Sequence, residues 1–494
     1  MNSFKLWEFF KLNKKMILLV SGVFGLLTCF FMGLSPLVSM GVISLVMAFW
    51  WIFEVLPLAG TALLPLVCYP MLGIMSTKKV APVYMSSILM LFIGGFTVAL
   101  AMQKWNLHKR IALKIVSFFG TKPSGLLMGF MVATSLLSMW ISNTATCVMM
   151  VSIGLAVIKS FEDIYGDNGP TKVFSSTLMM GIAYSATIGG VATIVGTPPN
   201  LAFVRIYSMN FPEQSEFYFS SWLVFGLPIC LLMLLSAYCV LYFMRIRKNQ
   251  LRPLSEEVIT KEVIKLGPMK KEEKWVGAIF VSMALLWVFR KKITIGALAI
   301  PGWSELLPRP EFVDDGTVAI TMALLLFMIP TEKGGRIIDK KVFEEIPWGT
   351  ILLFGGGFAL AKGIQATGLS QLIGESFLGI KHVSPTLIIS SLTLGMSLLT
   401  ELTSNMASTE MLLPILAAVS KSSQIPPLSL MIPATLAASC AFMFPAATAP
   451  NAIIFGSKRV GIGEMIKSGF LINLVCVFII TLFSLFFIPF FFPS

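Results

Sequence analysis

The sequence is poor in charged residues and in histidine, and its cysteines do not indicate a disulfide framework. Charged residues make up 12% of the 494 residues and hydrophobic residues 56%, whereas about 25% charged residues is usual in a soluble domain. With only two histidines, His108 and His382, a His-based zinc or haem centre is not expected. The seven cysteines lie mostly within apolar segments, where they resemble small packing residues rather than a disulfide framework or a metal site.

Motifs of the common membrane-bound enzymes and pumps are also missing. The chain has no Walker A loop and no His-Glu-x-x-His motif, and its longest polar connection, Arg245 to Lys274, is too short for a nucleotide-binding domain. We therefore expect neither an ATP-driven pump nor an enzyme. The net charge of +13 comes from Lys and Arg in short loops between apolar runs, so we expect no nucleic-acid partner.

Long apolar runs dominate the rest of the sequence. A crossing of a lipid bilayer by a helix needs roughly 17 to 25 mainly apolar residues, and the chain holds about eleven such runs. The first lies near Met16–Leu34 and the last near Gly469–Phe492. Because further spans follow the first run, we interpret it as a membrane anchor rather than a cleaved signal peptide.

The distribution of charge predicts the orientation of the chain in the membrane. Lys5, Lys11, Lys14 and Lys15 precede the first span, and nine basic residues lie between Arg245 and Lys274, so both segments should be cytoplasmic. The Met209–Phe219 connection carries two Glu and no Lys or Arg, which suits the outer side. We expect a multi-pass protein of the inner (plasma) membrane, with a cytoplasmic N-terminus and an extracytoplasmic C-terminus.

Three motifs occur twice, in the same order. The Gly-Gly-Phe and Ser-Asn motifs recur 262 residues later, and the proline-containing motif recurs 251 residues later. A duplicated fold is the economical explanation. The pairs are Gly94-Gly95-Phe96 with Gly356-Gly357-Phe358, Ser142-Asn143-Thr144 with Ser404-Asn405-Met406, and Gly196-Thr197-Pro198-Pro199-Asn200 with Ala447-Thr448-Ala449-Pro450-Asn451.

The spans fall into two copies of five crossings each, an odd number, so the second copy should enter the membrane from the opposite side. We divide the chain into residues 1–37 (N-terminal segment and first span), 38–244 (first repeat), 245–274 (cytoplasmic linker) and 275–494 (second repeat). Re-entrant hairpins are expected near 123–160 and 385–420. The expected spans lie near Val38–Leu56, Ala59–Met75, Met85–Gln103, Lys172–Val195 and Ser220–Met244, and near Trp275–Phe289, Gly316–Pro330, Gly349–Gly363, Leu428–Phe444 and Ile466–Phe490.

The predicted fold is thus an all-α polytopic membrane protein with about eleven transmembrane helices and two re-entrant hairpins, arranged as an inverted-topology repeat. Trp105–Phe119 and Thr367–Ile380, after the two Gly-Gly-Phe spans, mix charged and apolar residues as interfacial helices do. They are either hinge arms between a moving and a fixed body or ordinary connectors, and the sequence leaves this choice open.

The repeated polar motifs have the chemistry of an ion and anion site. Thr-Pro-Pro cannot continue a helix, because proline lacks an N–H and disfavours helical backbone before it. The freed carbonyls, with Ser and Thr hydroxyls and Asn amide oxygens, are hard neutral ligands that suit desolvated Na⁺, while exposed N–H groups at half-helix N-termini suit a carboxylate or sulfate. A single motif is better explained by a helix kink whose polar groups bond a neighbouring helix. Two copies at near-constant spacing favour a binding site.

Glu401, four residues before Asn405, has no acidic counterpart in the first repeat, where Met139 stands. Acids within the membrane are usually functional. A carboxylate beside an anion site would nevertheless repel the ligand, so we expect Glu401 to be a structural partner of its hairpin.

At these residues the sequence resembles the divalent anion/Na⁺ symporter family, the sodium-coupled di- and tricarboxylate transporters with sulfate-transporting relatives. The likeness covers nearly the whole chain. It includes the two Ser-Asn motifs and the Thr-Pro-Pro break, and also Trp50-Trp51 with Glu54 and Pro57, Thr61-Ala62-Leu63-Leu64-Pro65, Lys104-Trp105-Asn106-Leu107-His108-Lys109-Arg110 and Asp315-Gly316-Thr317-Val318-Ala319.

The resemblance implies a homodimer with an elevator mechanism, in which a domain carrying both hairpins slides against a scaffold. Carried over by position, the first Na⁺ site would use Ser138, Ser142, Asn143 and Gly196, and the second Thr400, Thr403, Asn405 and the Ala447 carbonyl. The substrate carboxylates would meet Asn143, Thr144, Ser404 and Asn405, with Thr197, Pro198 and Thr448 nearby.

Two departures from the family pattern concern substrate choice. Met406 stands where many members have Thr, and Ala449 replaces the first proline of the second break. The function implied is Na⁺-coupled uptake of a C4-dicarboxylate such as succinate, malate or fumarate. A dicarboxylate exchanger and a citrate or sulfate symporter of the same fold are the alternatives, and a channel would not need broken helices in two copies.

Overall fold

The computed structural model describes residues 3–214, 216–247, 251–253, 257–295, 298–377, 379 and 383–491. Parts of the predicted termini (1–2 and 492–494), of the linker (248–250 and 254–256) and of the second interfacial segment (378 and 380), as well as His382, lie outside the described residues. The described residues are almost entirely helical, which confirms the all-α prediction. One short antiparallel hairpin, β1 (Ile293–Ile295) and β2 (Leu298–Ile300), was not expected.

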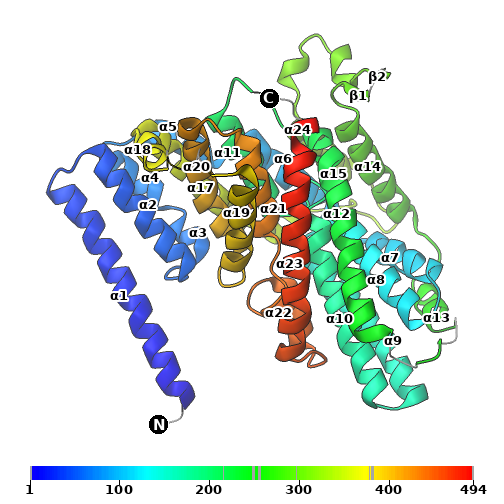
Figure 1. The fold of residues 1–494 in the computed structure, drawn as a ribbon. Helices are drawn as coiled ribbons and strands as arrows, with labels where there is room; N and C mark the ends of the chain where they lie inside the picture. The colour runs from blue at the N-terminus through cyan, green and yellow to red at the C-terminus, as the bar shows by residue number, and fades with distance from the viewer. Residues whose placement is uncertain are drawn as a thin grey trace.

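The N-terminal part begins with α1 (Ser3–Phe31), which stands at the edge of the molecule (Figure 1). Large apolar side chains such as Phe24 and Phe31 are mostly exposed along it, as expected of a helix that faces lipid. Ser35 caps the next helix, its hydroxyl accepting a hydrogen bond from the Val38 amide. The following helices are α2 (Pro36–Ile52), α3 (Leu58–Thr61), α4 (Leu64–Met71), α5 (Thr77–Val80), α6 (Ser87–Lys104) and α7 (Leu107–Phe118).

The predicted span near Ala59–Met75 corresponds to an apolar helical segment, Leu58–Met71, which is interrupted between α3 and α4. Pro65 is the second residue of α4. Without an N–H, Pro65 cannot bond the carbonyl of Thr61, so the helix ends and restarts.

The first hairpin consists of α8 (Pro123–Ser138) and α9 (Asn143–Tyr165), and the second of α19 (Pro385–Thr400) and α20 (Asn405–Ser423). In Figure 1 the first pair lies in the lower part of the molecule and the second in the upper part. Each hairpin is followed by a broken helix and a long helix. These are α10 (Gly169–Gly190), α11 (Pro198–Asn210) and α12 (Phe219–Leu241) in the first half, and α21 (Pro427–Ala438), α22 (Ala449–Gly456) and α23 (Ile462–Phe486) in the second.

The remaining described helices connect these units. They are α13 (Glu257–Lys265), α14 (Lys271–Val288), α15 (Asp315–Met328), α16 (Val342–Glu345), α17 (Trp348–Ala366), α18 (Leu369–Ser376) and α24 (Ile488–Phe491). α7 and α18 occupy equivalent places after α6 and α17, at the two predicted interfacial segments. Arg110 on α7 forms a two-pronged ion pair with Glu273 on α14 (2.5 and 3.2 Å).

The Gly-Gly-Phe motifs permit close helix contacts. A Cβ on Gly94 would lie 2.5 Å from the backbone carbon of Ala319 on α15, and one on Gly356 would lie 2.5 Å from the Cβ of Ala62. Small residues let transmembrane helices approach at backbone distance. The repeated glycines therefore explain how α6 and α17 pack.

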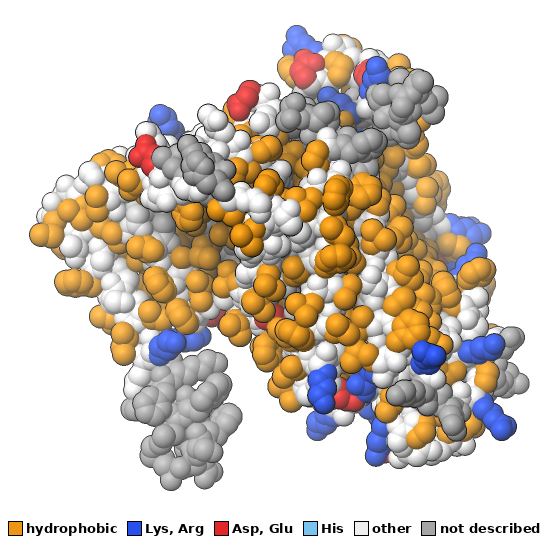
Figure 2. All heavy atoms as spheres, in the orientation of Figure 1, with side chains coloured by type: hydrophobic (Ala, Val, Ile, Leu, Met, Phe, Trp, Pro, Cys, Tyr) orange, Lys and Arg blue, Asp and Glu red, His pale blue; other side chains and the backbone are white. Residues whose placement is uncertain are grey.

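Five helices among the described residues are long and apolar enough to cross a bilayer by length and composition: Asn13–Phe31, Thr77–Lys104, Asn143–Tyr165, Phe219–Ile246 and Ile462–Phe486. Six shorter apolar helices accompany them, among them α8, α15, α19 and α21. Figure 2 shows hydrophobic side chains over the middle of the visible face, with Lys and Arg mostly toward its ends. This pattern is that of a multi-pass membrane protein.

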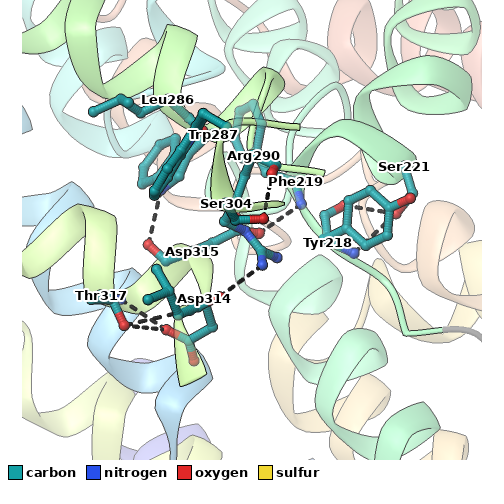
Figure 3. Close-up of polar contacts among 12 residues, drawn as sticks. Tyr218, Phe219, Ser221, Leu286, Trp287, Arg290, Ser304, Asp314, Asp315 and Thr317 are labelled. Carbon is teal, nitrogen blue, oxygen red and sulfur yellow. Dashed lines mark hydrogen bonds and ion pairs between the residues drawn. The ribbon is translucent and has the colours of Figure 1, made fainter. Parts of the chain in front are cut away.

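A buried ion pair lies where the start of α12, the end of α14 and the start of α15 meet (Figure 3). The Asp315 carboxylate accepts hydrogen bonds from Arg290 Nε (2.5 Å) and from the Phe219 amide at the start of α12 (2.8 Å). Its backbone oxygen accepts a hydrogen bond from Trp287 Nε1 (2.9 Å), and Arg290 also donates to the Val313 carbonyl (3.0 Å). Buried charges need such additional partners, and this set links α12, α14 and α15.

Candidate functional site

The two hairpin tips and the two helix breaks meet around one cavity of about 870 Å³. Its lining includes the N-cap residues of four helices: Ser142 of α9, Thr197 of α11, Ser404 of α20 and Thr448 of α22. The positive dipole ends of these helices therefore converge on one space, although α11 begins with two prolines and offers no N–H group at its first two positions. Such helix starts favour an anion.

Charged side chains are scarce in the described lining of this cavity. Only Lys15 and Glu54 carry charge, and Lys15 Nζ donates a hydrogen bond to the Glu54 backbone carbonyl (2.7 Å). Lys15 is thus the only cationic side chain in the described lining of the cavity. One positive charge does not balance a dianion, so bound cations would complete the neutralisation.

Behind the first tip lies a cluster of oxygen atoms. Ser138 Oγ is 2.5 Å from the Ala186 carbonyl oxygen and 2.7 Å from Asn143 Oδ1. A hydroxyl has one hydrogen and cannot satisfy both. If the Asn143 amide is turned round, its nitrogen donates to Ser138 Oγ (2.7 Å) and to the carbonyls of Gly196 and Ala186 (3.2 Å each).

These two amide orientations provide a test of fit for a cation. With the amide nitrogen toward Ser138, Asn143 donates hydrogen bonds to the oxygens of the cluster, and no cation is needed to balance them. With oxygen inward, the amide, one hydroxyl and two carbonyls converge with a surplus of acceptors, which a small hard cation balances. The donor set is neutral oxygen throughout, so the residues present fit Na⁺.

The second tip repeats this arrangement. Thr400 Oγ1 lies 2.5 Å from Asn405 Oδ1 and 2.9 Å from the Ala438 carbonyl oxygen. Thr403 lines the cavity, but its hydroxyl already bonds the Leu399 carbonyl (2.8 Å) and Ser408 Oγ (2.5 Å). Thr403 is thus less free to act as a ligand than the sequence suggested.

The structure brings together eleven of the thirteen predicted site residues in the cavity lining and places the other two, Ser138 and Thr400, fully buried behind the tips. Their roles as ligands remain predictions. The eleven are Ser142, Asn143, Thr144, Gly196, Thr197, Pro198, Thr403, Ser404, Asn405, Ala447 and Thr448.

Two buried asparagines were not predicted to support the site, although they end the repeated break motifs. Asn200 Nδ2 donates to the carbonyls of Gly190 (3.2 Å) and Thr193 (2.8 Å). Asn451 Nδ2 donates to the equivalent carbonyls of Ala441 (3.1 Å) and Phe444 (3.0 Å). Each asparagine side chain thus holds together the non-helical loop that precedes it. The offset of 251 residues between Asn200 and Asn451, shared with the rest of the motif, was the sequence signal that could have identified them.

Glu401 contacts protein and does not line the cavity. Its carboxylate accepts hydrogen bonds from the amides of Phe442 (2.7 Å), Met443 (2.9 Å) and Phe444 (3.1 Å), and from Asn473 Nδ2 (2.6 Å). This agrees with the expected structural role. It also explains why α21 ends at Ala438, six residues before the predicted end of that span, since these amides serve Glu401 instead of a helix.

Aromatic side chains support the first tip. Trp140, two residues before Ser142, lines the cavity and stacks on Phe219 (ring centroids 5.6 Å apart) and Trp287 (6.4 Å). Phe219 and Trp287 also stack on each other at 4.8 Å. The first tip therefore packs against Phe219 and Trp287, which both donate hydrogen bonds to Asp315 (Figure 3).

The chain matches the family described as the sodium:sulfate symporter transmembrane region over residues 13–492. A protein of Staphylococcus saprophyticus named sodium-dependent dicarboxylate transporter SdcS is 40% identical over 454 residues, 90% of this chain and 85% of the relative. Its namesake from Staphylococcus aureus (strain NCTC 8325) is 42% identical over 447 residues, 89% and 84% of the two chains.

Solved structures support the fold. The Alcanivorax borkumensis YdaH transporter aligns with a TM-score of 0.55 at 12% identity, over 84% of this chain and 87% of its own. Neisseria gonorrhoeae MtrF, described within a class of antimetabolite efflux pumps, aligns at 0.53 and 12% identity over 83% of both chains. The family resemblance found in the motifs is thus confirmed: this chain belongs to the sodium:sulfate symporter family and is a multi-pass membrane transporter, not an enzyme.

Proposed function

We propose that the protein imports C4-dicarboxylates such as succinate, malate or fumarate, driven by Na⁺ entering across the cytoplasmic membrane. One observation carries the proposal: two clusters of neutral oxygens flank a single cavity onto which four helix starts converge. The Staphylococcus relatives, named for dicarboxylates, favour that substrate over the sulfate in the family's description.

In this proposal the first Na⁺ is held by Ser138, Ser142, Asn143 and Gly196, and the second by Thr400, Thr403, Asn405 and Ala447. The dicarboxylate lies between the tips, against Asn143, Thr144, Ser404 and Asn405, with Thr197, Pro198 and Thr448 beside it. Each Asn has both an amide oxygen and an amide nitrogen. One side chain can therefore face the cation and the carboxylate together, which couples their binding.

In this proposal the cavity opens to the cytoplasm in the present conformation. Lys15, in the basic N-terminal segment, and Glu54 lie on its lining, and basic segments favour the cytoplasmic side. α1 begins at the bottom of Figure 1 and α23 ends at the top, which suits a cytoplasmic N-terminus and an extracytoplasmic C-terminus. We propose that the two hairpins move as one body in a homodimeric elevator.

Uptake of labelled succinate into proteoliposomes tests this function. An inward Na⁺ gradient with an interior-negative potential should drive accumulation, and K⁺ in place of Na⁺ should not. Uptake that ignores both Na⁺ and potential, but needs internal dicarboxylate, would replace symport with exchange. Stronger inhibition by unlabelled citrate or sulfate than by malate would change the substrate.

Met406→Thr should tighten dicarboxylate binding. Met406 lines the cavity at the place where Thr144 stands in the first repeat. An added hydroxyl hydrogen bond contributes about 0.5–1.5 kcal/mol, or roughly a two- to tenfold fall in Kd. Succinate titration by thermal shift measures it, with Met406→Val as the branched control that lacks the hydroxyl. Equal Kd values for the two variants would show that a hydroxyl at position 406 does not contact the substrate.

Gly196→Ala should weaken Na⁺ binding. A Cβ there would lie 2.5 Å from the Gly190 carbonyl oxygen, so the loop that carries the Gly196 carbonyl has to shift. If the bound ion requires the unshifted loop, the overpacking cost of about 1–3 kcal/mol corresponds to a roughly 5- to 150-fold fall in Na⁺ affinity. Ala447→Gly is the matched control, because the second loop already carries a Cβ at the equivalent position. A Na⁺ titration followed by thermal stability should separate the two variants, and equal Na⁺ affinity would place the first ion elsewhere.

A further inference from the structure

A buried carboxyl group without a partner lies on the second arm of the second hairpin. Glu410, on α20, is fully buried, and neither of its carboxyl oxygens has a hydrogen-bond partner among the described residues. It does not line the substrate cavity. It differs in this from Glu401, whose carboxylate is bonded by three amides and Asn473.

The contact that covers Glu410 comes from α17. A Cβ built on Gly357 would collide with the Glu410 carboxyl group, so the acid fits only because position 357 is glycine. The equivalent residue in the first repeat, 262 positions earlier, is Val148, which is 53% exposed. The repeated fold therefore does not require an acid at this place.

The surroundings offer no charge to pair with Glu410. α20 packs against α2, α11, α17, α18, α19 and α21. Within the described residues none of the titratable side chains on these helices or on α20 itself forms an ion pair or hydrogen bond with Glu410. These side chains are Arg205 and Tyr207 on α11, Lys362 on α17, Glu375 on α18 and Lys421 on α20, with Glu401 at the end of α19.

An ionised carboxylate in such a site would lack both water and a counter-charge. Its transfer from water costs far more than that of the neutral acid, so the group takes up a proton instead. In the conformation with the cavity open, Glu410 therefore carries its proton. The proton can leave only when water reaches the carboxyl group, and that requires α20 to move away from Gly357.

We infer that Glu410 is a proton-binding site whose proton travels with the substrate, as a third coupling cation beside two Na⁺. On exposure to water the O–H bond breaks, the electron pair stays on the carboxylate and the proton passes to water. The inference rests on the proposed symport. The proton would give that symport a net inward charge, which two Na⁺ and a dianion do not provide. A dianion with two Na⁺ moves no net charge, whereas one added proton moves one, and a membrane potential of 100 mV then contributes about 2.3 kcal/mol.

Proton flux measured together with uptake tests the inference. Proteoliposomes holding a trapped pH dye receive Na⁺ and labelled succinate at a pH well above the ordinary carboxyl range, where the substrate is a dianion. Wild type should acidify the interior by one proton per succinate. Glu410→Gln and the apolar Glu410→Met should still take up succinate but move no protons, while Glu375→Gln, an exposed control, should match wild type. Equal acidification by the Glu410 variants, or none by wild type, would overturn the inference.

An infrared measurement on detergent-solubilised protein separates this inference from the proposed function, since it needs no transport. The spectrum of wild type minus Glu410→Gln, or minus Glu410→Met if the first variant does not fold, should show the carbonyl band of a protonated carboxylic acid. Its absence would overturn the inference even if Na⁺-driven uptake is found. If the band is present but wild type takes up no succinate with Na⁺, the symport proposal fails while the protonated acid stands.

Discussion

Asn143→Ala and Asn405→Ala should each abolish Na⁺-dependent succinate binding. Each side chain joins an oxygen cluster to the cavity, Asn143 through Ser138 (2.7 Å) and Asn405 through Thr400 (2.5 Å). Truncation removes a cation ligand and a hydrogen bond to a carboxylate at once. Since a hydrogen bond to a charged group contributes about 1.5–3 kcal/mol, two lost contacts predict a fall in affinity of at least roughly a hundredfold.

Ligand-induced thermal stabilisation of purified protein measures this effect, because a ligand that binds only the folded state raises its stability. Wild type should gain stability from Na⁺ and succinate together, and neither variant should gain any. Asn13→Ala, at an exposed position on α1, is the matched control and should behave as wild type. Normal Na⁺-dependent stabilisation in both cavity variants would refute the site assignment.

Glu401→Ala should be the most destabilising single change proposed for this chain. The carboxylate is 2% exposed and bonds three consecutive backbone amides and Asn473. Glu401→Ala leaves these buried donors without an acceptor, and a buried unsatisfied donor costs about 1–3 kcal/mol. We expect a lower thermal midpoint and lower membrane expression.

The loop that Glu401 organises leads into Ala447 and Thr448, so any folded Glu401→Ala protein should also bind Na⁺ more weakly. Glu344→Ala, at an exposed acid, is the control and should leave the thermal midpoint unchanged. Asn473→Ala should cost less than Glu401→Ala, since the three amides keep their acceptor. Unchanged stability of Glu401→Ala would show that the amides of residues 442–444 find other acceptors.

The hairpins were predicted closely because their signals are local. Pro123 and Pro385 sit at the first helical position, where proline is favoured, and α8 and α19 begin at these residues. Ser142 and Ser404 stand at the N-cap positions of the returning arms, and the Ser142 hydroxyl accepts a hydrogen bond from the Ala145 amide. Proline likewise marked the start of α11, where Thr-Pro-Pro excludes a continuous helix.

Contacts between distant segments were not predictable in the same way. The early end of α21 depends on Glu401, about forty positions away in the sequence, and the break between α3 and α4 lies in a run that reads as one apolar span. Asn200 and Asn451 stood in the repeated motifs, but their donation to loop carbonyls needs a folded loop.

The sequence by itself determined the membrane class, the duplication and the residue types of the site, because hydrophobicity, proline and motif spacing are properties of the chain alone. Only the tertiary structure decided which polar groups have partners. Glu401 and Glu410 lie nine residues apart in one hairpin, yet among the described residues one carboxyl group is bonded by four donor groups and the other by none. That difference depends on which backbone each side chain meets: the free amides after α21 in the first case, and a glycine of α17 in the second.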